Sequence, residues 1–249
     1  GWYVVNRNVT IDELVTVTGN VRLILTDGTT LTVNGGIGGI NVAKGNSFSV
    51  YAQSVGENMG TLTATSSQFG KAGIGGEYLA SGGTITIHGG NVTASGGEDA
   101  AGIGGGWKGS GGTITIHGGS VTATCGSLAA GIGDGDGGSG SSFATGADGH
   151  ALIVANGGIS DTSNQNSWSG IIFEGNTGTV YGNPTIQENI EIPSGKTLTV
   201  PVNTTLTVKD GVTLTNNGKI INNGKITNNG TITGNGTVEG NQPLLPPPP

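Results

Sequence analysis

The sequence predicts an all-β fold: a parallel β-helix (β-solenoid) with three short strands in each coil, followed by a tighter C-terminal extension with a six-residue period. The first observation behind this prediction is a tandem repeat. Residues 72–100 and 101–129 are two copies of one 29-residue unit with 20 identical positions, and a third copy opens at Ala130. Units of this length are too short to bury an apolar face alone, so neighbouring copies are expected to stack around one continuous core.

The second observation is the pattern inside the unit. Apolar and polar residues alternate over 84–88 and again over 92–94, which is the period of a strand with one buried face, and glycine pairs bound both segments. Residues 72–75 supply a third short strand, and no stretch has the 3.6-residue period of a helix. The residues predicted to point into the core are Ile74, Ile85, Ile87, Val92 and Ala94.

The rest of the chain is interpreted as further coils. Residues 1–71 are predicted to form an N-terminal cap and the first coils, with Trp2 to Val5 covering the open end of the core. Residues 72–196 form the tandem-repeat coils, interrupted by a long loop at 133–150. After this loop, residues 151–158 are taken to match the repeated segment Thr-Ile-Thr-Ile-His-Gly-Gly.

The C-terminal part has a shorter period. Residues 197–242 are predicted to form this extension: from Leu214 to Val238 apolar residues recur every six positions and Asn-Gly pairs recur with them, so each step is predicted to be one short strand and one turn. Residues 243–249 are predicted to be a stiff, proline-rich linker outside the strand ladder, leading to further domains of the same polypeptide.

Composition narrows the function classes. The formal net charge is −7 and the chain has two arginines, which argues against nucleic acid or an anionic membrane surface as a partner. No signal peptide or membrane-spanning stretch is recognised, so no membrane insertion is expected. The single cysteine excludes a disulfide within the chain.

Several motifs resemble a known family. The runs Ala-Gly-Ile-Gly-Gly, Gly-Gly-Thr-Ile-Thr-Ile-His-Gly-Gly and Val-Thr-Ala-Ser-Gly-Gly, the opening Trp-Tyr-Val-Val and the Asn-Asn-Gly tail are similar to right-handed β-helix domains of large cell-surface proteins from Gram-positive gut bacteria. Those domains are often labelled carbohydrate-binding or adhesin-like. The resemblance implies a right-handed coil and an extracellular, cell-surface location, and its motifs specify the coil rather than a chemistry.

Stacking predicts which outward residues share a column. Tyr78 and Trp107 differ by one repeat and are expected to be adjacent, with Asp136 next in line. Aromatic rings on an otherwise aromatic-poor, threonine-lined surface suit a sugar, whose C–H face stacks on the ring while polar side chains bind its hydroxyls. The expected partner is therefore a polysaccharide or a host glycan or glycoprotein. The alternative is that both rings fold over a turn and cover glycine-rich backbone.

A second outward column is expected to contain Tyr51, His88, His117 and Asn156. It is a candidate ligand-binding surface. The two histidines, one coil apart, could also share a metal ion, and the alternative is a plain ladder of surface side chains. Asp134 and Asp136 form a weak candidate Ca²⁺ site, since carboxylates two residues apart with glycine between them reach one ion in calcium loops. The alternative for this pair is a solvated loop.

Three functions remain open at this point. The first is a non-catalytic surface module that binds a glycan or host ligand, and the second is a passive stalk. The third is a carbohydrate-active enzyme of the polysaccharide lyase or glycosidase type, which needs paired carboxylates or a carboxylate with a base in one groove. The residues available for that chemistry are Glu77, Lys108, Asp134 and Asp136.

Overall fold

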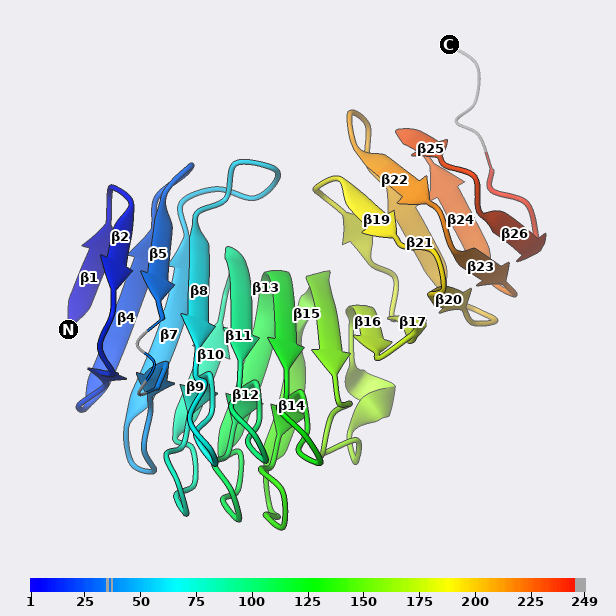
Figure 1. Cartoon of the computed structure of the whole chain (residues 1–249). Coiled ribbons are helices and arrows are strands. Elements are labelled where there is room, and N and C mark those ends of the chain that lie inside the picture. Colours follow the sequence, from blue (N-terminus) through cyan, green and yellow to red (C-terminus); the bar gives the residue numbers. More distant parts are fainter. Residues whose placement is uncertain (35, 37, 245–249) are drawn as a thin grey trace.

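The computed structural model describes residues 1–34, 36 and 38–244, and Figure 1 shows that they form two β-solenoids that follow one another along the chain. Within this described part the one helical element is the short 3₁₀ helix η1 (Gln165–Ser167). No helix there is long and apolar enough to cross a membrane. The predicted all-β solenoid fold is therefore confirmed.

The first solenoid has three faces of parallel strands. The first face contains β1 (Trp2–Val5), β4 (Asn20–Leu25), β7 (Ser47–Ala52), β10 (Thr84–Ile87) and the beginnings of β13 (Thr113–Thr124) and β15 (Ser142–Asn156). The second contains β2 (Val9–Ile11), β5 (Thr30–Val33), β8 (Thr61–Thr65), β11 (Asn91–Ser95) and the ends of β13 and β15. The third contains β3 (Val15–Thr16), β6 (Ile40–Asn41), β9 (Ile74–Gly75), β12 (Ile103–Gly104) and β14 (Ile132–Gly133).

The repeat sets the register of these strands. Ile85 pairs with Ile114, and Val92 pairs with Val121, so each residue meets its counterpart 29 positions later. The five residues predicted to point inward are all buried, at 0–1% exposure. Because apolar residues alternate with threonines along each strand, the apolar side chains all point inward and form one narrow core along the axis.

The glycine that ends each Ala-Gly-Ile-Gly motif is required by close backbone approach. Gly75, Gly104 and Gly133 stack in successive coils with φ between 127° and 141°, a conformation that side-chain-bearing residues rarely adopt. A Cβ on Gly75 would collide with the carbonyl oxygen of Gly104. The motif therefore fixes a tight corner at the third face.

The predicted loop at 133–150 is wrong in its second half. β15 begins at Ser142, and Phe143 and Thr145 pair with Ile114 and Ile116 in the register of the repeat. The register then shifts, so that His150 pairs with Gly118. Residues 151–156 consequently continue the second face rather than the first. The extra residues are accommodated as a bulge inside a long strand.

The N-terminal segment extends a sheet instead of folding across the end. β1 pairs in parallel with β4, and only Val5 is buried, while Trp2, Tyr3 and Val4 are all more than half exposed. Tyr3 lines an apolar hollow of about 380 Å³ at the first coils. The predicted covering of the core by this segment is therefore limited to Val5 and the edge of Tyr3.

The second solenoid has its own three faces and its own core. Its first face is β17 (Thr177–Tyr181), β20 (Thr197–Val200), β23 (Lys219–Asn222) and β26 (Thr237–Gly240). The second is β18 (Thr185–Ile186), β21 (Thr205–Val208) and β24 (Lys225–Asn228), and the third is β19 (Ile190–Ile192), β22 (Thr213–Asn216) and β25 (Thr231–Thr233). Three of the six-residue steps thus make one coil, and the second core reaches back to Ile171.

A hairpin joins the two solenoids. β16 (Gly170–Glu174) pairs in parallel with β15 but antiparallel with β17, so the strand direction reverses there. The buried side of the sheet also reverses, because Ile153 belongs to the first core while Leu152 packs against the second. Since the strand order advances the same way throughout, the two reversals cancel, and the second solenoid winds with the same hand as the first.

The end of the described chain returns to the ladder. Leu244 forms a parallel bridge with Thr227, and its amide donates to the carbonyl of Ile226 at 2.8 Å. The expectation that residues 243–249 stay outside the ladder is therefore wrong at Leu244, and residues 245–249 lie outside the described residues.

Candidate functional site

The structure brings Tyr78 and Trp107 together at the turn that follows the third face. Their ring centroids are 5.3 Å apart with an interplanar angle of 26°. Asp136 occupies the equivalent turn of the next coil, where its carbonyl accepts the amide of Lys108 at 2.7 Å. The predicted column is therefore formed by three successive turns.

A third ring, which the sequence analysis missed, completes this group. Phe69 lies in the turn after β8, with its ring centroid 5.9 Å from that of Tyr78 and 5.6 Å from that of Trp107. Phe69 and Tyr78 are 44% and 46% exposed, whereas Trp107 is half-buried. We call Phe69, Tyr78 and Trp107 the aromatic cluster. In a chain with 4% aromatic residues, three rings from three turns form a concentrated apolar surface.

Backbone geometry explains why the rings gather. Gly70 has φ +71°, and a Cβ there would lie 2.7 Å from Cδ2 of Tyr78 and 3.0 Å from Cβ of Trp107. The rings therefore pack directly on this glycine. Tyr78 and Trp107 thus cover backbone, as the alternative interpretation expected, and at the same time leave part of their surface in solvent.

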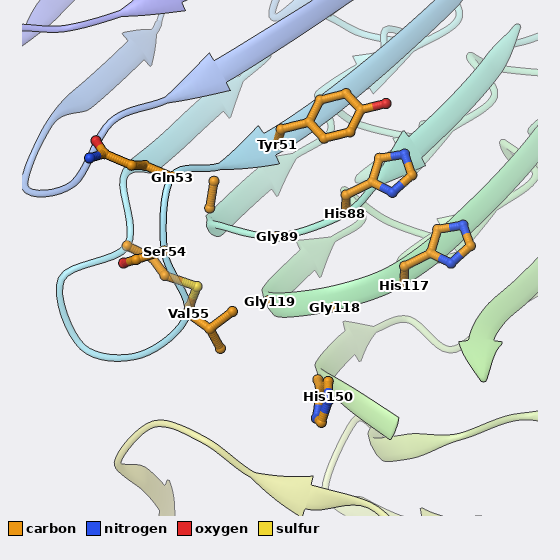
Figure 2. A pocket seen from close by; sticks show the side chains of 12 residues that line it. Tyr51, Gln53, Ser54, Val55, His88, Gly89, His117, Gly118, Gly119 and His150 are labelled. Carbon is orange, nitrogen blue, oxygen red and sulfur yellow. The ribbon is translucent and has the colours of Figure 1, made fainter. Parts of the chain in front are cut away.

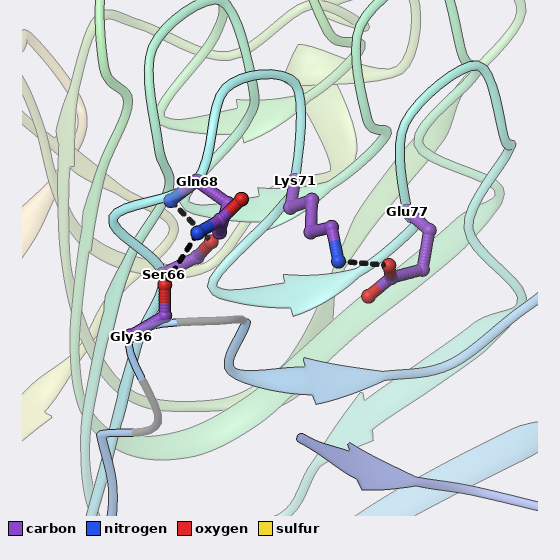
Figure 3. A network of polar contacts seen from close by, with 5 residues as sticks. All are labelled: Gly36, Ser66, Gln68, Lys71 and Glu77. Carbon is purple, nitrogen blue, oxygen red and sulfur yellow. Dashed lines mark hydrogen bonds and ion pairs between the residues drawn. The ribbon is translucent and has the colours of Figure 1, made fainter. Parts of the chain in front are cut away.

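Charged groups border the aromatic cluster. The Nζ atom of Lys108 lies 4.2 Å from the ring centroid of Trp107, a cation–π contact. Figure 3 shows Lys71 paired with Glu77, the residue before Tyr78, at 2.7 Å. The same figure shows Gln68 donating its side-chain amide to the carbonyl of Gly36 at 2.9 Å. Polar groups able to bind hydroxyls therefore lie close to the exposed rings.

The second predicted column is present as a ladder of rings on the first face. Tyr51 stacks on His88 with centroids 4.3 Å apart, and His88 stacks on His117 at 4.8 Å. The ladder extends to Trp2, which the sequence analysis did not include, at 5.3 Å from Tyr51. Because each ring covers the face of its neighbour, the ladder presents ring edges rather than a flat stacking surface.

Asn156 does not belong to this ladder, which corrects the prediction. The bulge in β15 shifts its register, so Asn156 pairs with Thr124 on the second face and donates to the hydroxyl of that threonine at 3.2 Å. The residue paired beside His117 is instead His150, opposite Gly118. The sequence indicated inserted residues at 133–150, but the periodic repeat gave no signal for how they divide between a loop and a strand.

A hollow of about 340 Å³ lies beside the ladder, and we call it the histidine groove (Figure 2). The side chains of Tyr51, His88 and His117 extend from neighbouring strands along one wall, and His150 lies beyond His117 at one end of the groove. All three histidines of the chain line it. Burial lowers the pKa of His88 below its usual value, and the neighbouring His117 lowers this pKa further by repulsion.

The candidate metal ligands have other geometries. The Oδ1 atom of Asp134 accepts the amides of Gly111 and Ser141, both at 3.0 Å, so this carboxylate holds its own loop against the preceding coil. Among the described residues no group of three or more His, Cys, Asp or Glu side chains converges on one point. The parallel rings of His88 and His117 direct their nitrogen lone pairs side by side rather than toward a common ion.

The residues available for enzyme chemistry are engaged separately. Glu77 pairs with Lys71, Lys108 lies over Trp107, and Asp134 accepts backbone amides. Each of these three side chains is thus held by a different partner.

Comparison with known proteins agrees with the architecture. Residues 58–76, 85–107 and 114–136 match a family of beta helix repeats, and these three stretches lie in consecutive coils of the first solenoid. No curated protein and no solved structure shows a significant match to the chain. The chain thus contains a β-helix repeat domain whose chemistry has to be inferred from its own surface.

Proposed function

We propose that this chain is a non-catalytic β-helix module of a cell-surface protein and that it binds a glycan, either a polysaccharide or the glycan of a host glycoprotein. Further domains of the same polypeptide would attach it to the cell. The observation that carries this proposal is the partly exposed aromatic cluster of Phe69, Tyr78 and Trp107, with centroids 5.3–5.9 Å apart.

The chemistry of the aromatic cluster suits a sugar better than a wholly apolar ligand. Exposed ring surface offers stacking to the C–H face of a pyranose, and the borders carry groups that bind hydroxyls. The bordering charges are Lys108 over Trp107 and the Lys71–Glu77 pair. A surface formed by turns in this way suits a polysaccharide that lies along it, rather than a small molecule that is enclosed in a cleft.

The experiment is a glycan-array screen of the folded chain, followed by calorimetry on the glycan that binds best. Trp107→Ala is expected to weaken binding by about 1–3 kcal/mol, in the range of well-packed aromatic contacts at interfaces. Trp107→Phe should recover part of that loss. Tyr3→Ala is the matched control, because it removes an exposed ring from another part of the surface.

The melting temperature of each variant separates binding from packing. If Trp107→Ala lowers the melting temperature strongly and leaves affinity unchanged, the rings serve to cover the turns and the proposed contact is wrong. A silent array with the wild-type chain would favour a stalk.

A further inference from the structure

The histidine groove is a second candidate site, separate from the aromatic cluster. One wall is the ring ladder on the first face, and the facing wall is formed by the loop after β7, including Gln53, Val55 and Met59. His150 closes one side, where its Nδ1 atom lies 2.9 Å from the side-chain amide of Gln187 at the start of the second solenoid. The groove is thus built from four separate stretches of the chain, within residues 51–59, 88–89, 117–119 and at His150.

The two central histidines present donors in a defined arrangement. The rings of His88 and His117 are parallel within 1° and their centroids are 4.8 Å apart, and Figure 2 shows both projecting in the same direction. Because the ring faces are stacked, the groups that remain for a ligand are the ring-edge nitrogens. A protonated imidazole donates from both nitrogens, so two parallel rings offer side-by-side N–H groups that two oxygens of one oxyanion can accept.

The charge distribution around the groove favours an anion when the histidines are protonated. Among the residues whose side chains the structure describes, the lining contains no aspartate or glutamate, while Tyr51 adds a hydroxyl. Two carboxylates beside the loop that lines the groove have other partners. Glu57, on the loop, accepts the side-chain amide of Asn189, and Asp27 accepts the hydroxyl of Ser54 at 2.8 Å. 

Two further charged groups border the ladder and the junction. Arg22 lies 5.3 Å from the ring centroid of Trp2, at the far end of the ladder. Glu188 lines a separate small hollow on the other side of His150. Protonating His88 and His117 together brings two like charges close, and an oxyanion between the two ring edges offsets that repulsion.

We propose that the histidine groove binds one oxyanion, a carboxylate or sulfate group of an acidic ligand, between the ring edges of His88 and His117, and binds it more tightly as the pH falls and the two imidazoles become protonated. This inference does not depend on the proposed glycan contact at Trp107. The source of the oxyanion is distinguished by two probes, sodium sulfate and sodium glucuronate.

The test is a pH titration of the histidine Cε1–H resonances of the whole chain by NMR, which is tractable because the chain has three histidines. Sodium chloride at matched ionic strength is the reference. With sulfate or glucuronate we expect the titration midpoints of His88 and His117 to rise together by about half a pH unit or more, because a bound anion favours the charged form. A rise with only one probe identifies the source of the oxyanion.

Two variants make the test specific. His117→Gln should abolish the anion-dependent rise at His88, whereas Thr115→Gln, an outward substitution two residues earlier on the same strand, should preserve it. The inference is overturned if both probes shift the midpoints no more than chloride does. It is also overturned if the rise at His88 persists in the His117→Gln variant while circular dichroism shows that this variant is folded.

Discussion

Ile171 and Ile172 are adjacent in the sequence and belong to two different hydrophobic cores. Ile172 packs inside the first solenoid, and Ile171 packs inside the second, with 2% and 1% of their surfaces exposed. The strand β16 that carries them is therefore a wall shared by both solenoids. This arrangement allows each core to be perturbed without touching the other.

Ile171→Ala should loosen the second solenoid and Ile172→Ala the first. Each substitution leaves a cavity in a packed core, at a cost of about 2–5 kcal/mol. Hydrogen–deuterium exchange should show faster exchange at 197–222 for Ile171→Ala and at 113–124 for Ile172→Ala. Identical exchange patterns for the two variants would mean that the solenoids unfold as one cooperative unit.

The assignment of inward and outward residues predicts a contrast between neighbouring positions. Replacing Ile87 and Ile116 together by Asp places two unpaired charges at fully buried, adjacent sites, which costs several kcal/mol and should prevent folding. Replacing Thr86 and Thr115 by Asp should have a small effect, because both project outward. Thermal denaturation and expression yield provide the comparison, and equal damage from both pairs would contradict the assignment.

Neighbouring asparagines in the second solenoid should differ in the same way. Asn222 is fully buried, and its amide donates to the carbonyl of Asn241 at 2.7 Å, whereas Asn223 is exposed. Asn222→Asp removes this donor and buries a charge, so we expect a loss of several kcal/mol in the free energy of unfolding. Asn223→Asp should stay within about 0.5 kcal/mol of the wild type in denaturant titrations. Similar losses in the free energy of unfolding for the two variants would show that the fold does not depend specifically on the buried amide of Asn222.

Glu188 should make the stability of the chain pH-dependent. Burial raises the pKa of this carboxyl from 4.5 to about 7, so the folded state holds a proton that the unfolded state has released. The stabilising contribution is complete below pH 4.5 and is lost as the pH rises through 7. Relative to Glu188→Gln, the wild type should therefore lose stability between pH 5 and pH 8, as measured by denaturant titration at each pH. Parallel profiles for the two proteins would contradict this prediction.

The sequence was sufficient to predict the stacking of the coils and the place where the repeat is interrupted, but not the structure of the interruption. A repeat of 29 residues fixes which side chains meet, so the stacking of Tyr78 on Trp107 and of His88 on His117 followed from spacing alone. The bulge that shifts Asn156 to another face depends on how extra residues are distributed between a loop and a strand, and periodicity carries no information about that choice.

The junction left a signal that the sequence analysis did not use. Residues 151–155 and 171–173, on the two strands at the junction, are runs of consecutive apolar residues, and such runs are typical of strands buried on both faces. Phe69 and Trp2 left no comparable signal. Both lie outside the two 29-residue copies, 72–100 and 101–129, and their contacts with Trp107 and Tyr51 arise from turns and strand ends whose paths the sequence pattern does not specify.

The 29-residue register also links the two candidate binding surfaces. Each matched unit contributes one aromatic residue to the turn edge, Tyr78 or Trp107, and one imidazole to the ladder, His88 or His117. Inserting another such unit in frame would therefore raise the valency of both surfaces together. Duplication or loss of a unit would in this way tune avidity at two sites in a single genetic step, without any change to the chemistry of either contact.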